Sequence, residues 1–288
     1  PPIAQEVYYR QILETNEELN ILEEGHFNII NTFNRKKMPK SVSVKNARGY
    51  IDMKAYADLG KMVAKNIDDD SIFIALTAES LLGFNTDMEA LRNDNDGIFG
   101  DNSLKYYNYK FAGMSIKNDR MLYMITFDQK EDKKKTLYQG IMLIDTANYA
   151  VVEIEANLSP IGIDFQKFLP LKVRLLAKIA GYTINVQDIA FKAKYVQYNS
   201  YWVIDHGGLQ LKGSITKRKG VTLNGSLQLD YFVRRNYPKG EFFNMRTKYE
   251  VIASDLAPFN DAYFFEDRGL PALSDKVRNK VKQKLSKQ

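Results

Sequence analysis

The sequence predicts an α+β fold, a large curved antiparallel sheet with helices on one face. The strongest observation is the segment from Val221 to Val233, where apolar and polar residues alternate throughout, the period of a long strand with one face in water. The segment 136–160 adds a hairpin, because two strand-like halves flank a polar turn. Helical spacing is confined to short segments. No internal repeat and no linker rich in Pro, Gly or Ser divides the 288 residues, so we expect a single domain, 1–288.

The first part of the chain, residues 1–103, is expected to mix helix and strand. Residues 1–20 favour a helix, and residues 21–35 combine strand-forming with turn-forming residues and predict a strand. Two further helical segments are predicted at 52–66 and 76–93, where apolar residues at helical spacing follow Asp or Thr as a cap.

A polar turn cluster at 93–102 precedes the predicted main antiparallel sheet, 104–255. Besides the hairpin and the long strand already described, its strands are expected at 104–111, 120–127, 189–198 and 208–216. Segment 164–182 interrupts the strand pattern, and its apolar residues at helical spacing predict a short helix. The final segment, 256–288, is expected to end in a basic helix.

The register of the predicted hairpin depends on the length of its turn. Its first strand is apolar on both faces, whereas the second alternates. A four-residue turn would place Ile141 and Leu143 on the same face as Ile154, and a five-residue turn would place Met142 and Ile144 there instead. In either register the face opposite the core is apolar along this strand, as in a curved sheet that holds helices or a hydrophobic guest.

These apolar residues and the many aromatic ones are candidates for a hydrophobic groove. The chain has 18 Tyr and 16 Phe. Aromatic residues on strands usually fill the packing surface of a sheet, and the alternative is a groove that binds acyl chains or sugar rings. The groove candidates are Tyr106, Met124, Ile141, Met142, Leu143 and Ile144.

All of the formal net charge of +6 lies at the end of the chain, where six basic residues follow Asp275 without a single acid. Apolar residues recur every four positions from Leu273 to Leu285, so a helix over 273–286 is predicted to dock on the body with its basic face in water. The alternative is contact with an anionic membrane surface. Its candidate residues are Lys276, Arg278, Lys280, Lys282 and Lys284. No nucleic acid is expected, since no aromatic residues are interleaved with the basic ones.

The sequence offers little chemistry. There is no Cys, which excludes disulfides, thiolate metal sites and a Cys nucleophile, and no catalytic, nucleotide-binding or metal-binding motif occurs. We therefore expect no metal, no cofactor and no catalytic residue. Of the two His, His206 lies in the sequence Asp-His-Gly-Gly, which predicts a turn between strands. An enzyme acting on polysaccharide or peptide would have to use Asp205 with His206, or Glu153 with Glu155.

Several segments resemble one known family. The stretch EVYYRQI near the start, the strands YYNYKF and RMLYMITF, and the hairpin LYQGIMLIDTANYAVVEIEANLS are similar to Bacteroidetes envelope proteins with a carboxypeptidase-like regulatory domain, in the domain that follows their transthyretin-like module. Gly140, Ile144-Asp145 and Tyr149-Ala150 match the hairpin motif of that domain. The hairpin also resembles that of LolA, the outer-membrane lipoprotein carrier, whose curved half-barrel encloses helices and a lipid cavity. The resemblance covers residues 7–33 and 104–159.

The resemblance implies a periplasmic or outer-membrane-associated protein. The chain begins at Pro1-Pro2, which we interpret as a chain from which a signal peptide has been removed. The expected function is a non-catalytic envelope module that binds a lipid or acyl chain or an envelope protein partner. The alternatives are an enzyme acting on envelope polysaccharide or peptide and a purely structural spacer domain.

Overall fold

The computed structural model describes residues 3–31, 41–52, 97–163, 182–217, 220, 222–237, 257–258 and 273–285. Its strands are β1 (Ile3–Thr15), β2 (Glu18–Asn31), β3 (Ser41–Ile51), β4 (Tyr107–Lys117), β5 (Arg120–Gln129), β6 (Tyr138–Asp145), β7 (Val151–Leu158), β8 (Tyr182–Tyr198), β9 (Tyr201–Lys217), β10 (Thr222–Tyr237) and β11 (Ala257–Pro258). Its helices are α3 (Ser103–Tyr106), α4 (Pro160–Ile163) and α6 (Asp275–Leu285).

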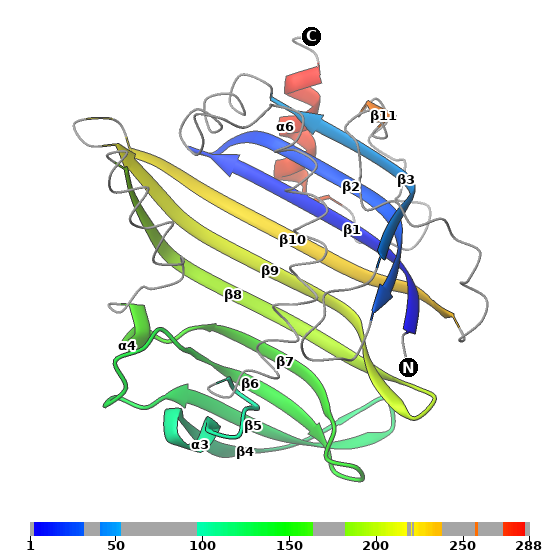
Figure 1. Ribbon diagram of the computed structural model, residues 1–288, viewed down its shortest axis with the longest axis vertical. Coiled ribbons are helices and arrows are strands. Elements are labelled where there is room, and N and C mark those ends of the chain that lie inside the picture. Colours follow the sequence, from blue (N-terminus) through cyan, green and yellow to red (C-terminus); the bar gives the residue numbers. More distant parts are fainter. Residues whose placement is uncertain are drawn as a thin grey trace.

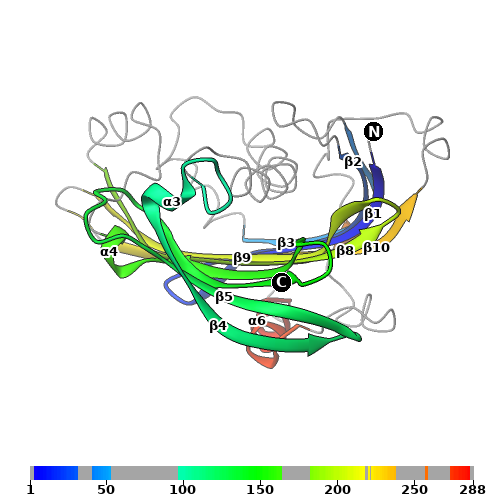
Figure 2. The ribbon, with the colours of Figure 1, turned by 90° about the horizontal axis from the view of Figure 1, so that it is seen from below.

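All the described strands belong to one curved sheet, in the order β11-β3-β2-β1-β10-β9-β8-β7-β6-β5-β4 (Figure 1). Every pairing is antiparallel except the short parallel contact of β11 with β3. The N-terminal hairpin joins the sheet through β1, which pairs with β10 from Ala4↔Tyr237 to Thr15↔Gly225. Seen from its edge, the sheet is a curved layer with α6 on one side and α3 on the other (Figure 2). The expected α+β class and curved antiparallel sheet are confirmed.

One face of the sheet, which we call the core face, carries the main hydrophobic core. A row of directly paired residues crosses it from strand to strand, and its apolar members are fully or partly buried. From β5 to β1 the row includes Ile125, Met142, Ile154, Ala193, Tyr231 and Tyr9. Burial of such a row contributes the main stabilisation of a sheet, at about 25 cal/mol per Å² of apolar surface.

The opposite face, which we call the polar face, is covered at one end by α6. Val277 and Val281 of α6, and Leu273 just before it, are buried against Ile12 and Leu22. The latter two are cross-strand partners in β1 and β2. The expected helix at the end of the chain is therefore confirmed, and it docks on the body as its apolar stripe predicted.

The helix expected over residues 1–20 is wrong, because the described part of this range, from Ile3, forms β1 and the start of β2. Tyr8 and Tyr9 point to opposite faces and are both fully buried, so the segment lacks the alternation that marks a half-exposed strand. Long-range pairing with β10 overrides its local preference for a helix.

Two smaller expectations are also wrong. Residues 104–106, expected as strand, form the short turn of helix α3, and β4 begins at Tyr107. Residues 205–208, expected as a turn, lie inside β9, where Gly207 and Gly208 pair with both neighbouring strands. The two glycines carry no side chain and let neighbouring groups approach the strand closely. They do not reverse the chain.

Other expectations are confirmed or lie outside the described residues. The strands at 120–127, 189–198 and 208–216 are present, as is the long strand up to Val233, although Val221 itself is not described. The polar cluster forms turns over 97–102. The predicted helices at 52–66, 76–93 and 164–182 fall almost entirely on residues that the structure does not describe. The division of the chain at 103 and 256 stays a prediction.

The hairpin adopts the register of the longer turn. Residues 146–150 connect β6 and β7, and Met142 lies opposite Ile154. Asp145 organises the turn, because its Oδ1 accepts a hydrogen bond from the Ala147 N–H (2.8 Å) and its Oδ2 one from Arg120 Nη1 (2.8 Å). The backbone bond from Ala147 is the main reason that the pKa of Asp145 lies below its ordinary value.

Candidate binding site: a hollow on the polar face

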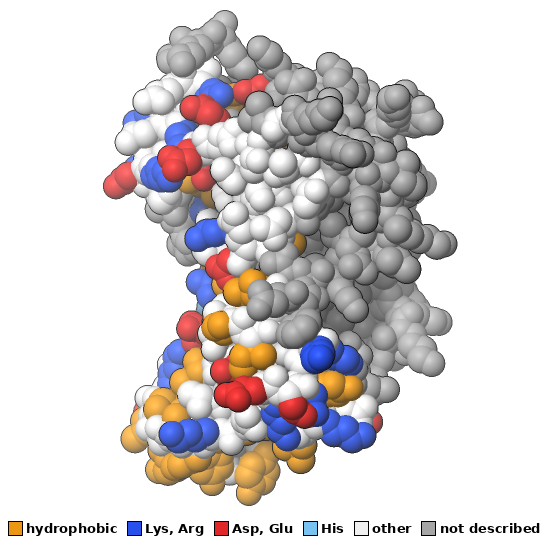
Figure 3. Space-filling view, turned by 90° about the vertical axis from the view of Figure 1, so that its left-hand side faces the viewer, with side chains coloured by type: hydrophobic (Ala, Val, Ile, Leu, Met, Phe, Trp, Pro, Cys, Tyr) orange, Lys and Arg blue, Asp and Glu red, His pale blue; other side chains and the backbone are white. Residues whose placement is uncertain are grey.

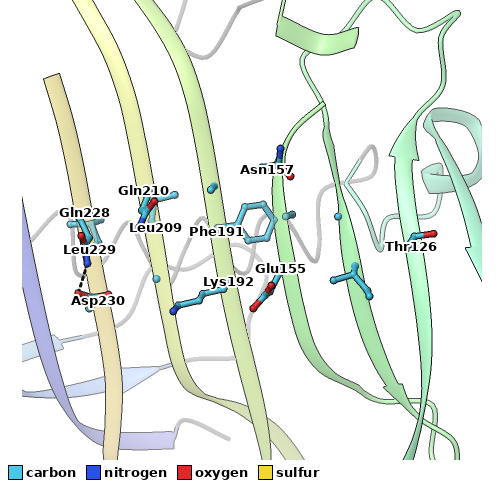
Figure 4. A pocket seen from close by; sticks show the side chains of 15 residues that line it. Thr126, Glu155, Asn157, Phe191, Lys192, Leu209, Gln210, Gln228, Leu229 and Asp230 are labelled. Atoms are coloured by element: carbon cyan, nitrogen blue, oxygen red, sulfur yellow. Dashed lines mark hydrogen bonds between the residues drawn. The ribbon is translucent and has the colours of Figure 1, made fainter. Parts of the chain in front are cut away.

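A hollow of about 630 Å³ lies over the six neighbouring strands β5 to β10. In the side view of Figure 3 the left-hand outline of the molecule is hollowed at mid-height, between its upper and lower ends. The polar side chains that line the hollow are Thr126, Glu155, Asn157, Lys192, Gln210, Gln228 and Asp230 (Figure 4). Ala190 and Gly208, which have little or no side chain, line it as well.

A row of charges crosses the polar face through this hollow. Each member is the direct cross-strand partner of the next, so all point to the same face. In strand order from β6 to β3 the row consists of Ile141, Glu155, Lys192, Gly208, Asp230, Arg10, Glu24 and Arg48. We call this set the charged row. Its charges alternate in sign from Glu155 to Arg48, with Gly208 as the single uncharged position among them.

Gly208 allows two members of the row to approach across β9. A Cβ at Gly208 would lie 3.3 Å from Lys192 Cε and 3.6 Å from Asp230 Oδ1, so the lysine and the carboxylate share the space above the glycine. Gln228 Nε2 donates a hydrogen bond to Asp230 Oδ2 (3.0 Å; dashed in Figure 4). Burial raises the pKa of the Asp230 carboxyl above its ordinary value, although Arg10, Gln228 and Lys192 oppose the shift.

At the β1–β3 end the charged row is buried. One carboxylate, that of Glu24, accepts hydrogen bonds from Arg10 Nε (3.0 Å), Arg48 Nε (2.6 Å) and the Tyr8 hydroxyl (2.5 Å). Burial is the main cause that raises the pKa of Tyr8 above its ordinary value. Burial disfavours the charge on Arg10, but the neighbouring Tyr8 and Glu24 raise its pKa above the ordinary value. Because these charges are paired and hydrogen-bonded, the end is a rigid anchor for the row.

The structure divides the predicted groove residues between the two faces. Met142 is buried in the core, and Tyr106 and Ile144 pack against that core. Ile141 lines the hollow. Met124 and Leu143 are paired with each other and half-buried. The six candidates therefore do not form one groove.

The predicted basic residues of the tail partly face the body. Lys280 Nζ lies 2.5 Å from Glu14 Oε1, and Lys284 Nζ lies 3.2 Å from Asp52 Oδ2. Lys276 and Lys282 are exposed, and Arg278 is half-buried. A membrane contact through these residues stays a prediction.

The side chains considered for catalysis are Glu153 and Glu155, about 7 Å apart on one face of β7, and Asp205 beside His206, and the enzyme stays an untested alternative. Glu153 forms an ion pair with Lys117, and His206 Nδ1 lies 3.3 Å from the neighbouring Asp205 Oδ2. In the hollow, Glu155 and Asp230 lie three strand spacings apart, about 14 Å. Glycoside hydrolysis needs two carboxyl groups about 5 to 9.5 Å apart. Within the described ranges, no three side chains of the metal-binding types converge.

Sequence reasoning missed Lys192, Gly208, Asp230 and Arg10. Lys192 and Asp230 are polar members of a local alternation, but nothing in the chain order relates position 10 to position 230. The one local signal was the glycine pair Gly207-Gly208 within a strand-like segment, because a glycine in a strand can mark a position that neighbouring groups approach closely.

Comparisons with known proteins add little to this geometry. No family model and no curated protein matches the chain. Among solved structures, the complex of Pseudomonas aeruginosa MucA and MucB matches at 10% identity, covering 81% of this chain and 88% of that chain with a TM-score of 0.21. MucB in complex with MucA(peri) matches at 8% identity, covering 80% of this chain and 88% of that chain with a TM-score of 0.19.

Likenesses with such low TM-scores carry no argument about fold or function. The resemblance to the Bacteroidetes family and to LolA therefore stays a prediction. Among the described residues, no helix combines the length and the apolarity needed to cross a membrane.

Proposed function

We propose that this protein is a non-catalytic binding module of the cell envelope, and that it holds an extended, charged segment of a partner protein in the polar hollow. The observation that carries the proposal is the charged row, whose exposed members Glu155 and Lys192 stand over the hollow. The envelope setting is supported by the sequence resemblance alone.

The lining suits a polypeptide better than an acyl chain. Amide side chains of Asn157, Gln210 and Gln228 offer donors and acceptors to a peptide backbone. Along the charged row, the sign of the charge alternates across the strands. A bound segment whose own charges alternate along the row can pair with it. An acyl chain would leave these polar groups without partners, which costs free energy. A lipid ligand therefore becomes the competing outcome of the test.

A non-catalytic role is supported by the distance of about 14 Å between Glu155 and Asp230, the two carboxylates of the hollow. Recognition of an extended segment needs only the fixed charges and amides that the rigid sheet supplies. The anchored end of the charged row holds Arg10 beside Asp230 and thereby limits the movement of the row.

A peptide array combined with titration tests the proposal. The array would contain extended decapeptides in which Lys and Glu alternate at every second position with Ser between them, so that both charges lie on one face. Scrambled and neutral versions serve as controls, and affinities are measured by fluorescence anisotropy. We expect the alternating peptides to bind, with affinity that falls as salt rises. Reversal of one charge in Lys192→Glu should weaken binding about tenfold, whereas the control Lys212→Glu, an exposed residue of β9 that does not line the hollow, should not.

Two results would contradict the peptide proposal. A fluorescent fatty acid that binds while every peptide fails would overturn the peptide proposal in favour of a lipid ligand. Peptide binding that is unaffected by Lys192→Glu would place the site elsewhere and also overturn it.

A further inference from the structure

The edge strand β4 carries an exposed apolar stripe. β4 ends the sheet, and among the described residues only β5 pairs with it. Phe111, Met114 and Ile116 are 58%, 49% and 75% exposed. Hydrophobic side chains gather at the lower end of the molecule in Figure 3, which is the β4–β5 end in Figure 1. An edge strand with exposed apolar side chains is a site at which another strand can add.

A bulge brings this stripe onto one face. The register with β5 shifts between Phe111 and Gly113, and Gly113 has a φ of +125°. Because of the extra residue, Tyr109 and Phe111 before the bulge share a face with Met114 and Ile116 after it. Without the extra residue, Tyr109 and Phe111 would point to the opposite face from Met114 and Ile116.

We propose that the partner of this edge is β4 of a second copy of the chain, antiparallel, with the twofold axis between Ala112 and Gly113. In this register the bulges of both copies meet at the axis and stay in phase. Phe111 then lies opposite Met114 of the second copy, and Tyr109 opposite Ile116. The apolar stripe of one copy continues into that of the other, which is the self-complementarity that a twofold interface requires.

The charges on the other face of β4 fit the same register. Lys110 lies opposite Ser115 of the second copy, and Lys117 opposite Asn108, so no like charges face each other. Sliding the partner by two residues in one direction places Lys110 opposite Lys117. Sliding it in the other direction places Ile116 opposite Tyr107, which the fold already buries. The register with its axis at Ala112 and Gly113 is therefore favoured.

This dimer is independent of the polar hollow, so each proposal can fail without the other. Sedimentation velocity of the full chain over a concentration series measures the association. We expect a monomer–dimer equilibrium whose dissociation constant rises about tenfold or more in Met114→Glu, because that change buries an unpaired charge at the interface. Tyr149→Glu, at an exposed residue of the β6–β7 turn and outside β4, is the matched control and should leave the equilibrium unchanged.

Disulfide trapping tests the register, since the chain has no other Cys. A mixture of the Lys110→Cys and Ser115→Cys variants should form a covalent heterodimer on mild oxidation, and a mixture of Lys110→Cys and Lys117→Cys should not. A chain that stays monomeric at every concentration overturns the proposal, as does a dimer that Met114→Glu leaves intact. Trapping through the second mixture alone overturns the register.

Discussion

At the scale of single residues, the most demanding feature is the buried carboxylate of Glu24 between two arginines. Arg10, Glu24 and Arg48 are each at most 5% exposed, and Tyr8 adds a further hydrogen bond. Charges are stable at such depth only when each has a partner. Asp230, the next acid in the charged row, faces Arg10 from β10 and adds a second negative charge beside this arginine.

Removal of the charge on Glu24 should be strongly destabilising. We expect Glu24→Gln to lower the free energy of unfolding by about 3–5 kcal/mol, because two buried guanidinium groups would lose the carboxylate that they share. Urea denaturation followed by circular dichroism measures the loss, with Glu131→Gln at an exposed turn as control. A loss no larger than that of the control would show that water or other groups already solvate the arginines.

Asp230 should give stability a pH dependence of the less common sign for a carboxylate. Burial raises its pKa above the ordinary 3.8 in the folded state. Its contribution to stability is therefore complete below pH 3.8 and is lost as the pH rises through the raised pKa. We expect the unfolding free energy of the wild type, relative to Asp230→Asn, to decrease as the pH rises above 3.8 and through the raised pKa of Asp230.

At the scale of elements, the β6–β7 hairpin depends on Gly140. A Cβ at this position would lie 2.1 Å from the carbonyl oxygen of Glu155 and 2.8 Å from the Cα of Ala156. Both are backbone atoms of the paired strand β7, so no side-chain movement can relieve the overlap. The close approach of the two backbones explains a glycine within this strand.

We expect Gly140→Ala to cost about 3 kcal/mol or more, since the two strands must separate locally. The matched substitution Gly225→Ala, also in a strand, should cost much less, because its Cβ would meet only the Glu14 carbonyl oxygen at 3.8 Å. Thermal unfolding of the two variants measures the difference. Equal melting temperatures would mean that the β6–β7 pairing adjusts freely.

Helix α6 is held by its apolar stripe. Val281 is 2% exposed in the cluster with Ile12 and Leu22. We expect Val281→Ala to lower the unfolding free energy by about 2 kcal/mol, whereas Asn279→Ala on the exposed side of the helix should have little effect. Chemical denaturation of both variants tests this. Indistinguishable stabilities would mean that the helix is not docked in solution.

At the scale of the whole molecule, the docked tail limits contact with membranes. Lys280 and Lys284 already face carboxylates of the body. Each remaining basic residue near an anionic surface contributes about 1 kcal/mol, which is too little for firm binding by the few that are left. We expect equally weak sedimentation with anionic vesicles for the full chain and for a chain ending at Asp275. Salt-sensitive binding that disappears on truncation would establish the membrane contact.

The charged row is also a property of the whole molecule. Its members come from β1, β2 and β3 at the start of the chain and from β7, β8 and β10 much later. They meet because β1 pairs with β10 and so joins the N-terminal strands to the rest of the sheet.

The sequence by itself determined the features that depend on local periodicity. The alternation up to Val233 defined a long strand, and the spacing of Leu273, Val277 and Val281 defined the docked helix. Each of these follows from the geometry of one element, in which side chains at fixed spacing share a face.

Only the tertiary structure decided the rest. It made a strand of the segment that contains Tyr8 and Tyr9, because both faces of β1 are covered and the alternation that marks a strand is absent. It also set the neighbours of each strand, and with them the hollow at Lys192 and the exposed stripe of β4. The period of a strand is encoded in neighbouring residues, whereas its partners are selected by contacts between residues far apart in the chain, which no local pattern records.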